Sequence, residues 1–313
     1  MSKRHELNAR PGTVHWGYYD HILEPILTIQ SGDVVVVRSL FGLPTDMHHD
    51  RNRIPEDLVA IHEKVPRDLG PHILVGPIAV EGAEPGDVLA VRILDIQLGL
   101  NWGHNRFMPE KGTLPEDFPK AHSWIIEIDK KSKTAQWIAG TKVSVEHPFF
   151  GNLGVAPAPS LGRISSRFPD QHGGNLDNKE LGSGSTLYFP VYNPGAQFSV
   201  GDGHAAQGDG EVDGTAVETG LVGEFELTLR KDFSLRLPRA ETKSHYITMA
   251  FDPDLDVAAK IALREMLDYM VTTYDLSREE AYSLSTAVVD LRITQTVNGN
   301  KGVHAMLPKA VFK

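Results

Sequence analysis

The chain has 313 residues, with a hydrophobic content of 41% and a charged content of 23%, as expected for a globular protein with a sizeable core. Its formal net charge is −10 at pH 7, which argues against nucleic acid as the main partner because phosphate binding needs a basic surface. The sequence contains no cysteine, which excludes disulfides, thiolate metal ligands and a catalytic thiol.

Residues 1–100 are expected to form β-structure. β-branched residues fill the segment 25–40, where a Ser-Gly-Asp turn signal at 31–33 divides two strands. Residues 73–98 repeat this arrangement around a turn rich in Gly and Pro. The shared pattern is compatible with two equivalent hairpins in one sheet system.

No apolar run approaches the roughly 20 residues needed to cross a bilayer. None follows the positively charged start MSKRHELNARPGTVHW either, so no secretory signal is visible. We therefore expect a cytoplasmic protein with no membrane partner.

The middle of the chain is expected to alternate loops and strands. Residues 41–72 and 99–122 are polar, and loops of this length in a compact domain tend to be functional or disordered. Residues 122–138 predict a hairpin with a Lys-rich turn. Alternating apolar and polar residues over 223–251 predict a half-buried sheet.

Helices are expected near the C-terminus. Apolar residues recur at helical spacing from Leu255 to Met270, and Ser277 with Glu280 predicts a capping box that starts a second helix. A final strand is expected over 291–297. The predicted fold class is α+β, predominantly β-rich with sandwich-like or barrel-like sheets and a small C-terminal helical layer. Since no linker is visible, we expect a single domain over 1–313.

The stretch GDGHAAQGDGEVDG (201–214) is the main candidate for a chemical site. Its glycines allow tight turns and close approach of a ligand. Acidic and imidazole side chains recur along it: Asp202, His204, Asp209, Glu211 and Asp213. In an extended segment a spacing of two places side chains on one face, and crowded carboxylates repel unless a cation or proton lies among them. Such a set suits Zn²⁺, Mn²⁺, Fe²⁺ or Ca²⁺.

Other interpretations of this stretch remain open. Most Asp-Gly pairs cap turns in water. The segment DGEVDG (209–214) is similar to the start of an EF-hand, but the twelfth position of that loop is Gly220 instead of Glu. A second candidate, QHGGNLDNK (171–179), offers Asp177 as a further ligand and Asn175 as an amide that holds substrate. Alone it is typical of a turn.

Three segments in order resemble the central block of the acetamidase/formamidase family: GGNLDNK (173–179), GSTLYFPV (184–191) and GAQFSVGDGHAAQGDGEVDGTAVET (195–219). Residues 72–93 and 277–309 resemble its N-terminal hairpin and its C-terminal block, so the resemblance covers most of the chain.

The resemblance implies hydrolysis of short aliphatic amides, such as formamide or acetamide, to a carboxylate and ammonia. It also implies a β-rich α+β fold, cytoplasmic use, a homo-oligomer (dimer or higher) and a divalent metal, with zinc expected before manganese, iron or calcium. Asp213 stands where the family commonly has a cysteine, so a mechanism that needs this thiol is not expected here.

Within this hypothesis each candidate residue has an expected role. Three side chains are expected to bind the metal: Asp177, Asp202 and His204. Three carboxylates are candidates for the proton carrier between water and the departing nitrogen, with the first preferred: Glu211, Asp209 and Glu218. Two amides are expected to hold the substrate: Asn175 and Gln207.

Two alternative functions remain at this stage. One is a hydrolase of another C–N bond, since the polar segments 41–72 and 99–122 could close over a larger pocket and select substrates by size. The other is a non-catalytic binding protein that a metal stabilises.

Overall fold

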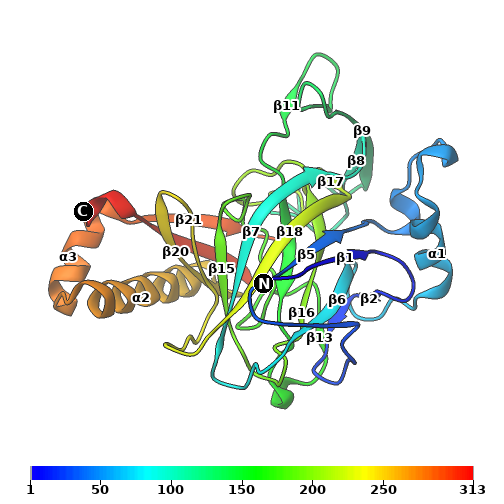
Figure 1. Cartoon of the computed structure of the whole chain (residues 1–313). Helices are drawn as coiled ribbons and strands as arrows, with labels where there is room; N and C mark the ends of the chain where they lie inside the picture. The colour runs from blue at the N-terminus through cyan, green and yellow to red at the C-terminus, as the bar shows by residue number, and fades with distance from the viewer. Residues whose placement is uncertain (1, 313) are drawn as a thin grey trace.

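The structure is a computed structural model that describes residues 2–312. Two large β-sheets make up most of it (Figure 1). The nine-stranded sheet contains, in spatial order, β1 (Arg4–Asn8), β5 (Asp33–Arg38), β18 (Leu221–Arg230), β7 (Val88–Leu98), β15 (Thr186–Pro190), β19 (Arg239–Glu241), β20 (His245–Asp252), β22 (Lys301–Pro308) and β21 (Asp290–Gln295).

The second sheet has eleven strands, and it carries the candidate site. Its main path contains, in spatial order, β11 (Val143–Ser144), β10 (Thr134–Gln136), β9 (His122–Asp129), β8 (Trp102–Phe107), β17 (Glu218–Thr219), β16 (Phe198–His204), β12 (Phe149–Gly154) and β14 (Gly173–Asn175). Off this path, β6 (Ile73–Val80) pairs with β16, β2 (Val14–Trp16) and β4 (Leu27–Ile29). A separate pair joins β3 (Tyr18–Tyr19) to β13 (Ile164–Ser165).

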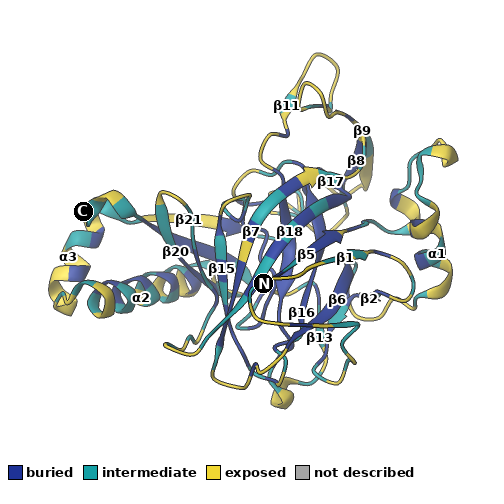
Figure 2. Ribbon diagram, in the orientation of Figure 1, coloured by how far each residue is buried: buried dark blue, intermediate teal, exposed yellow. Residues whose placement is uncertain are grey.

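The main core lies between the two sheets, and Figure 2 shows the buried residues gathered there. On β18 every second residue from Leu221 to Leu227 is buried, as the alternating pattern predicts. Phe225 packs on Phe150 of β12 and Phe198 of β16, with ring centroids 5.4 and 6.0 Å apart. Aromatic side chains thus pack the nine-stranded sheet against the eleven-stranded sheet that carries the candidate site.

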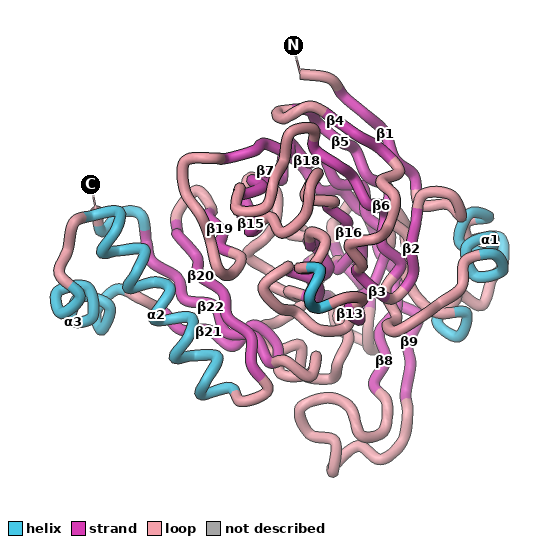
Figure 3. Tube along the Cα trace, turned by 90° about the horizontal axis from the view of Figure 1, so that it is seen from below, coloured by secondary structure: helices cyan, strands magenta, loops and turns pink. Residues whose placement is uncertain are grey.

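Helices pack at two ends of the molecule (Figure 3). The helix α2 (Leu255–Tyr274) packs on β20 and β22, and α3 (Arg278–Val288) follows it. The predicted capping box is confirmed, because Ser277 Oγ accepts from the Glu280 N–H while Glu280 accepts from the Ser277 N–H. Among residues 2–312, no helix is long and apolar enough to span a bilayer.

The predominantly β fold with a C-terminal helical part is confirmed, but four local predictions are wrong. Residues 99–122, expected as a loop, contain β8, and β22 follows the strand that was expected to be the last. The strands of 25–40 and of 73–98 do not form hairpins: β4 and β6 belong to one sheet, and β5 and β7 to the other. Local alternation cannot reveal a turn that carries the chain between layers. Residues 41–72 also contain a helix, α1 (Glu56–Lys64), which buries only Leu58 and Ile61 and so gives a weak apolar pattern. The expectation of one domain stays a prediction.

Candidate active site

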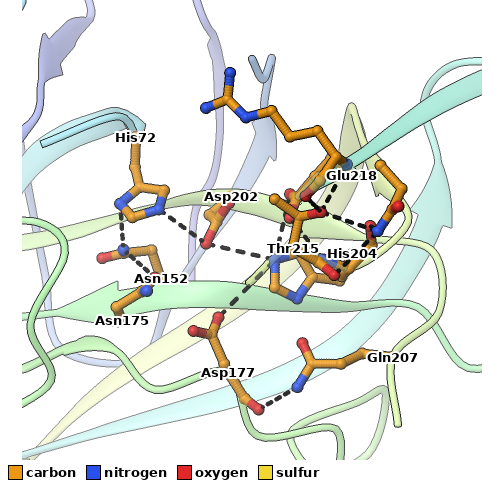
Figure 4. A network of polar contacts seen from close by, with 12 residues as sticks. His72, Asn152, Asn175, Asp177, Asp202, His204, Gln207, Thr215 and Glu218 are labelled. Carbon is orange, nitrogen blue, oxygen red and sulfur yellow. Dashed lines mark hydrogen bonds and ion pairs between the residues drawn. The ribbon is translucent and has the colours of Figure 1, made fainter. Parts of the chain in front are cut away.

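Acidic and imidazole side chains converge on one face of the eleven-stranded sheet (Figure 4). Asp202 and His204 lie two apart on β16, and Glu218 on β17 pairs directly with His204. His204 Nε2 is 3.3 Å from Glu218 Oε2 and 3.5 Å from Asp202 Oδ2. Asp177, just after β14, places Oδ1 3.9 Å from the same nitrogen. Glu211, in the loop after β16, brings a carboxylate oxygen within 4.8 Å of Asp177 and His204.

Gly151 of β12 leaves the space at the centre of this cluster. A Cβ atom at this position would lie 2.6 Å from His204 Cε1 and 2.7 Å from Asp202 Oδ2, and closer still to Asp177 Oδ1. Its carbonyl also accepts from the Asp177 N–H at 3.1 Å. The three predicted metal ligands therefore surround one small space, and any larger residue would fill it.

The backbone at the site is held in an unusual conformation. Asp177, Asp202 and Glu211 have φ angles of 46°, 62° and 44°, in the left-handed region that non-glycine residues rarely adopt. Such conformations persist where the surrounding structure imposes them, and they gather at functional sites. Here Asp177 and Glu211 form one possible ligand group with His204, and Asp202 forms a second one with His204 and Glu218.

Several polar atoms of the cluster lack a hydrogen-bond partner within residues 2–312: Asp177 Oδ1, Glu211 Oε2, and both ring nitrogens of His204. Buried polar atoms are nearly always paired, so an unpaired group needs an explanation such as an ion. Carboxylate oxygens together with an imidazole form a donor set that suits a divalent cation. The residues present therefore fit a metal.

The close packing of these side chains shifts their pKa values. Burial raises the pKa of Asp177 to about 7 and raises the pKa of Glu211 well above its ordinary range. Burial also raises the pKa of Glu218. Burial alone would raise the pKa of Asp202, but attraction by His72 and His204 lowers it below its usual value. Burial opposes a charge on His204, yet the Glu218 and Asp202 carboxylates raise the pKa of His204 well above its usual value. Protons and a cation therefore compete for this site.

Amide side chains form hydrogen bonds around the cluster. Asn298 Nδ2 donates to Asp177 Oδ2, and Gln207 Nε2 donates to the Asp177 carbonyl at 2.8 Å. Asn152 Nδ2 donates to Asn175 Oδ1 at 2.8 Å. Asn175 lines the cavity described below, whereas Gln207 lies beside Asp177 away from its wall.

One candidate lies apart from the others. The Asp209 carboxylate is 3.0 Å from Lys179 Nζ, and its side chain is 31% exposed. It does not line the cavity. Asp209 is only two residues from Glu211 in the chain. Its side chain nevertheless forms an ion pair at the surface, because the loop turns at Gly210, where φ is 98°. Glu218, by contrast, is 12% exposed and joins the cluster.

Sequence reasoning gave no role to several residues of the site. His72 Nε2 lies 3.7 Å from Asp202 Oδ2, and His104 on β8 pairs with Glu218. Gly151 and Asn298 were also missed. Their positions depend on strand pairing between distant segments, which no local spacing reports. The His48–His49 pair lies outside the cavity wall.

A cavity of about 430 Å³ opens over the cluster. Asp202, Glu211 and Glu218 line it, together with Asn175 and Asn298. Much of the remaining wall comes from residues 40–46, 67–73 and 104–112, which are the polar segments expected to shape a pocket.

These features define a buried carboxylate–imidazole site on a β-rich scaffold. The family described as Acetamidase/Formamidase matches residues 4–167 and 164–313, and the chain belongs to this family. It is 31% identical to an acetamidase of Mycolicibacterium smegmatis over 205 residues, which cover 46% of this chain and 50% of that protein.

It is also 31% identical to a formamidase of Methylophilus methylotrophus over 193 residues, 45% of this chain and 47% of that protein. The alignments thus span about half the length of these relatives. The crystal structure of an acetamidase from Bacillus halodurans has a TM-score of 0.85 and 30% sequence identity, with 98% of each chain covered.

Proposed function

We propose that this chain is a metal-dependent hydrolase of amides, which converts a carboxamide and water to a carboxylate and ammonia. The observation that carries the proposal is the space at Gly151, which Asp177, Asp202 and His204 surround with unpaired or acidic atoms. The names of the relatives, acetamidase and formamidase, support amide hydrolysis as the reaction.

Asp177, Asp202 and His204 would hold the ion. A divalent cation supplies Lewis-acid chemistry, in which a carbonyl is polarised and water becomes more acidic. Zinc is the first ion to test because zinc sites use imidazole and carboxylate ligands, and manganese, iron and calcium are the alternatives. Asn298 orients Asp177 through its hydrogen bond, as residues behind metal ligands commonly do.

Glu211 is the proposed proton carrier. Its Oε2 atom is buried without a partner among the described residues, and its side chain lines the cavity. Burial raises the pKa of Glu211 well above its ordinary range, which favours its protonated form relative to that of an exposed carboxyl group. Such a group takes a proton from water when ionised and returns it to the departing nitrogen. Asn175, on the cavity wall, would hold the amide.

The test is ammonia release from formamide and acetamide by the full chain, with and without a chelator. Glu211→Gln should lower turnover by about 10²- to 10⁴-fold, the usual contribution of general acid–base catalysis, and should retain the metal. Asp209→Asn makes the same chemical change two residues away and should leave turnover within about twofold, because this side chain is engaged by Lys179 at the surface.

Three outcomes would contradict the proposal. If the chelated protein works equally well, metal dependence is wrong. If Glu211→Gln loses its metal along with turnover, Glu211 is a ligand instead of the proton carrier. If the protein binds metal but releases no ammonia from any amide, the non-catalytic alternative stands. Light scattering on the same preparation tests the expected homo-oligomer.

A further inference from the structure

The cavity is larger than a short amide requires. Its volume is about 430 Å³, within the range of pockets that bury drug-sized ligands, roughly 300–1,000 Å³. Formamide and acetamide have so few non-hydrogen atoms that each takes about the space of two or three waters, on the order of 60–90 Å³. Most of the cavity would stay empty of substrate if these were the natural compounds.

The wall of this cavity carries basic side chains as well as acidic ones. Four basic side chains line it: Arg67, Arg106, Lys111 and Arg167. In the described part of the chain, Arg67, Lys111 and Arg167 form no ion pair within 4.0 Å. Just outside the cavity, Arg163 is paired with two carboxylates. The same wall carries six carboxyl groups: Asp46, Asp68, Asp202, Glu211, Asp213 and Glu218. An anion is therefore attracted only beside the three unpaired cations and not to the wall as a whole.

The carboxylates of the outer wall already have donors. Asp46 Oδ1 accepts from Arg106 Nη1 at 2.7 Å, and Arg106 keeps 21% of its side chain exposed. Asp68 accepts from Arg163, and Asp213 accepts from Asn105 Nδ2 at 3.0 Å. The unpaired cations therefore remain available to a ligand.

Two of the guanidinium groups belong to different sides of the acidic cluster. Arg167 directly follows Ser166, whose carbonyl and hydroxyl oxygens lie 3.1 and 2.9 Å from His72 Nδ1, beside Asp202. Arg106 lies two residues after His104 on β8, and His104 pairs with Glu218. A molecule with its amide at the cluster could therefore reach a cation with its far end.

We propose that the substrate is an amide whose far end carries a carboxylate, such as the monoamide of a short dicarboxylic acid; this rests on the amide hydrolysis proposed above. The amide lies at the acidic cluster, and Arg167, which has no ion-pair partner among the described residues, binds the carboxylate, since the planar guanidinium matches carboxylate geometry. Water adds its oxygen to the amide carbon, the C–N bond breaks, and the nitrogen leaves as ammonia with a proton from Glu211. The product is a dicarboxylate.

A matched pair of compounds tests this inference. Succinamate and 4-oxopentanamide have the same number of non-hydrogen atoms, and differ only in one carboxylate oxygen that a methyl group replaces. The wild-type chain should show a kcat/KM for succinamate at least about tenfold higher than for 4-oxopentanamide. Arg167→Gln should reduce this ratio by about tenfold to a hundredfold, the effect of losing a hydrogen bond to a charged group.

Further variants isolate the local charge. Arg167→Lys should keep part of the ratio that Arg167→Gln loses, because lysine keeps the charge but lacks the planar fork. Arg264→Gln removes an equal charge from the exposed surface of α2, away from the cavity wall, and should leave the ratio unchanged. A loss of the same size in Arg264→Gln would overturn the local assignment.

Calorimetric binding to the Glu211→Gln variant provides a readout without turnover. Succinamate should bind more tightly than 4-oxopentanamide, and added salt should reduce the difference because it screens exposed charges. Equal affinities and equal kcat/KM values, with ammonia still released from formamide, would overturn the anionic substrate and leave the hydrolase standing. No ammonia from any of the three amides would overturn the proposed hydrolysis, and the binding preference alone would then decide whether the cavity takes anionic ligands.

Discussion

Replacing Gly151 by alanine tests whether a cation lies among Asp177, Asp202 and His204. The added Cβ would lie 2.6 Å from His204 Cε1 and 2.7 Å from Asp202 Oδ2, and nearer still to Asp177 Oδ1. These side chains are 1%, 8% and 1% exposed, so they have little room to withdraw. Gly151 is not in the left-handed region, so the added methyl group acts through crowding and not through backbone strain.

The expected effect has two parts. Overpacking costs about 1–3 kcal/mol, which in a protein of this size lowers Tm by about 1.5 °C per kcal/mol. Metal affinity should fall by at least about 10- to 100-fold, which is the loss seen when only the groups behind the ligands are changed. The loss should be larger here because the ligands themselves must move.

The assay compares metal content by elemental analysis, ammonia release and thermal unfolding for wild type, Gly151→Ala and Gly12→Ala. Gly12 has open space at its Cβ position and no left-handed φ, so its variant should be neutral or slightly stabilised. A folded Gly151→Ala protein with full metal content and full ammonia release would refute the reasoning, because the ion would then lie elsewhere.

Three further perturbations follow from the same structure. Asn298→Ala removes the donor to the Asp177 carboxylate and should weaken metal binding by about 10- to 100-fold in a metal titration; Asn300→Ala, which loses only a bond to a carbonyl oxygen, should not. Burial lowers the pKa of His15 from 6.5 to about 4, so between these values the unfolded state binds more protons and the free energy of unfolding falls as pH falls, by up to about 1.4 kcal/mol per pH unit. His15→Gln should flatten that slope in denaturant titrations, and an unchanged slope would count against a neutral buried imidazole. Ser277→Ala should lower the free energy of unfolding by about 1 kcal/mol by removing the helix cap, and a value near zero in urea titrations would contradict the capping role.

Local patterns in the chain were enough to predict much of this protein. Three features depend only on neighbours in sequence, so they can be predicted before the fold is known. They are the capping box at Ser277, the alternation along 223–251 and the two-residue spacing of Asp202 and His204. The glycine-rich stretch 201–214 supplies Asp202, His204 and Glu211 to the cluster. Its spacing correctly put Asp202 and His204 on one strand face.

Pairing between strands that are distant in the sequence determines the rest of the candidate site. Strand β16 lies between β17 and β12. Glu218 on β17 and Gly151 on β12 therefore reach His204 through strand pairing and not through local spacing in the sequence. The left-handed turn at Gly210 sends Asp209 to Lys179 at the surface, although its spacing from Glu211 is the same as that of Asp202 from His204. An equal spacing places two side chains on one face only where the backbone stays extended, and only the tertiary structure determines where that holds.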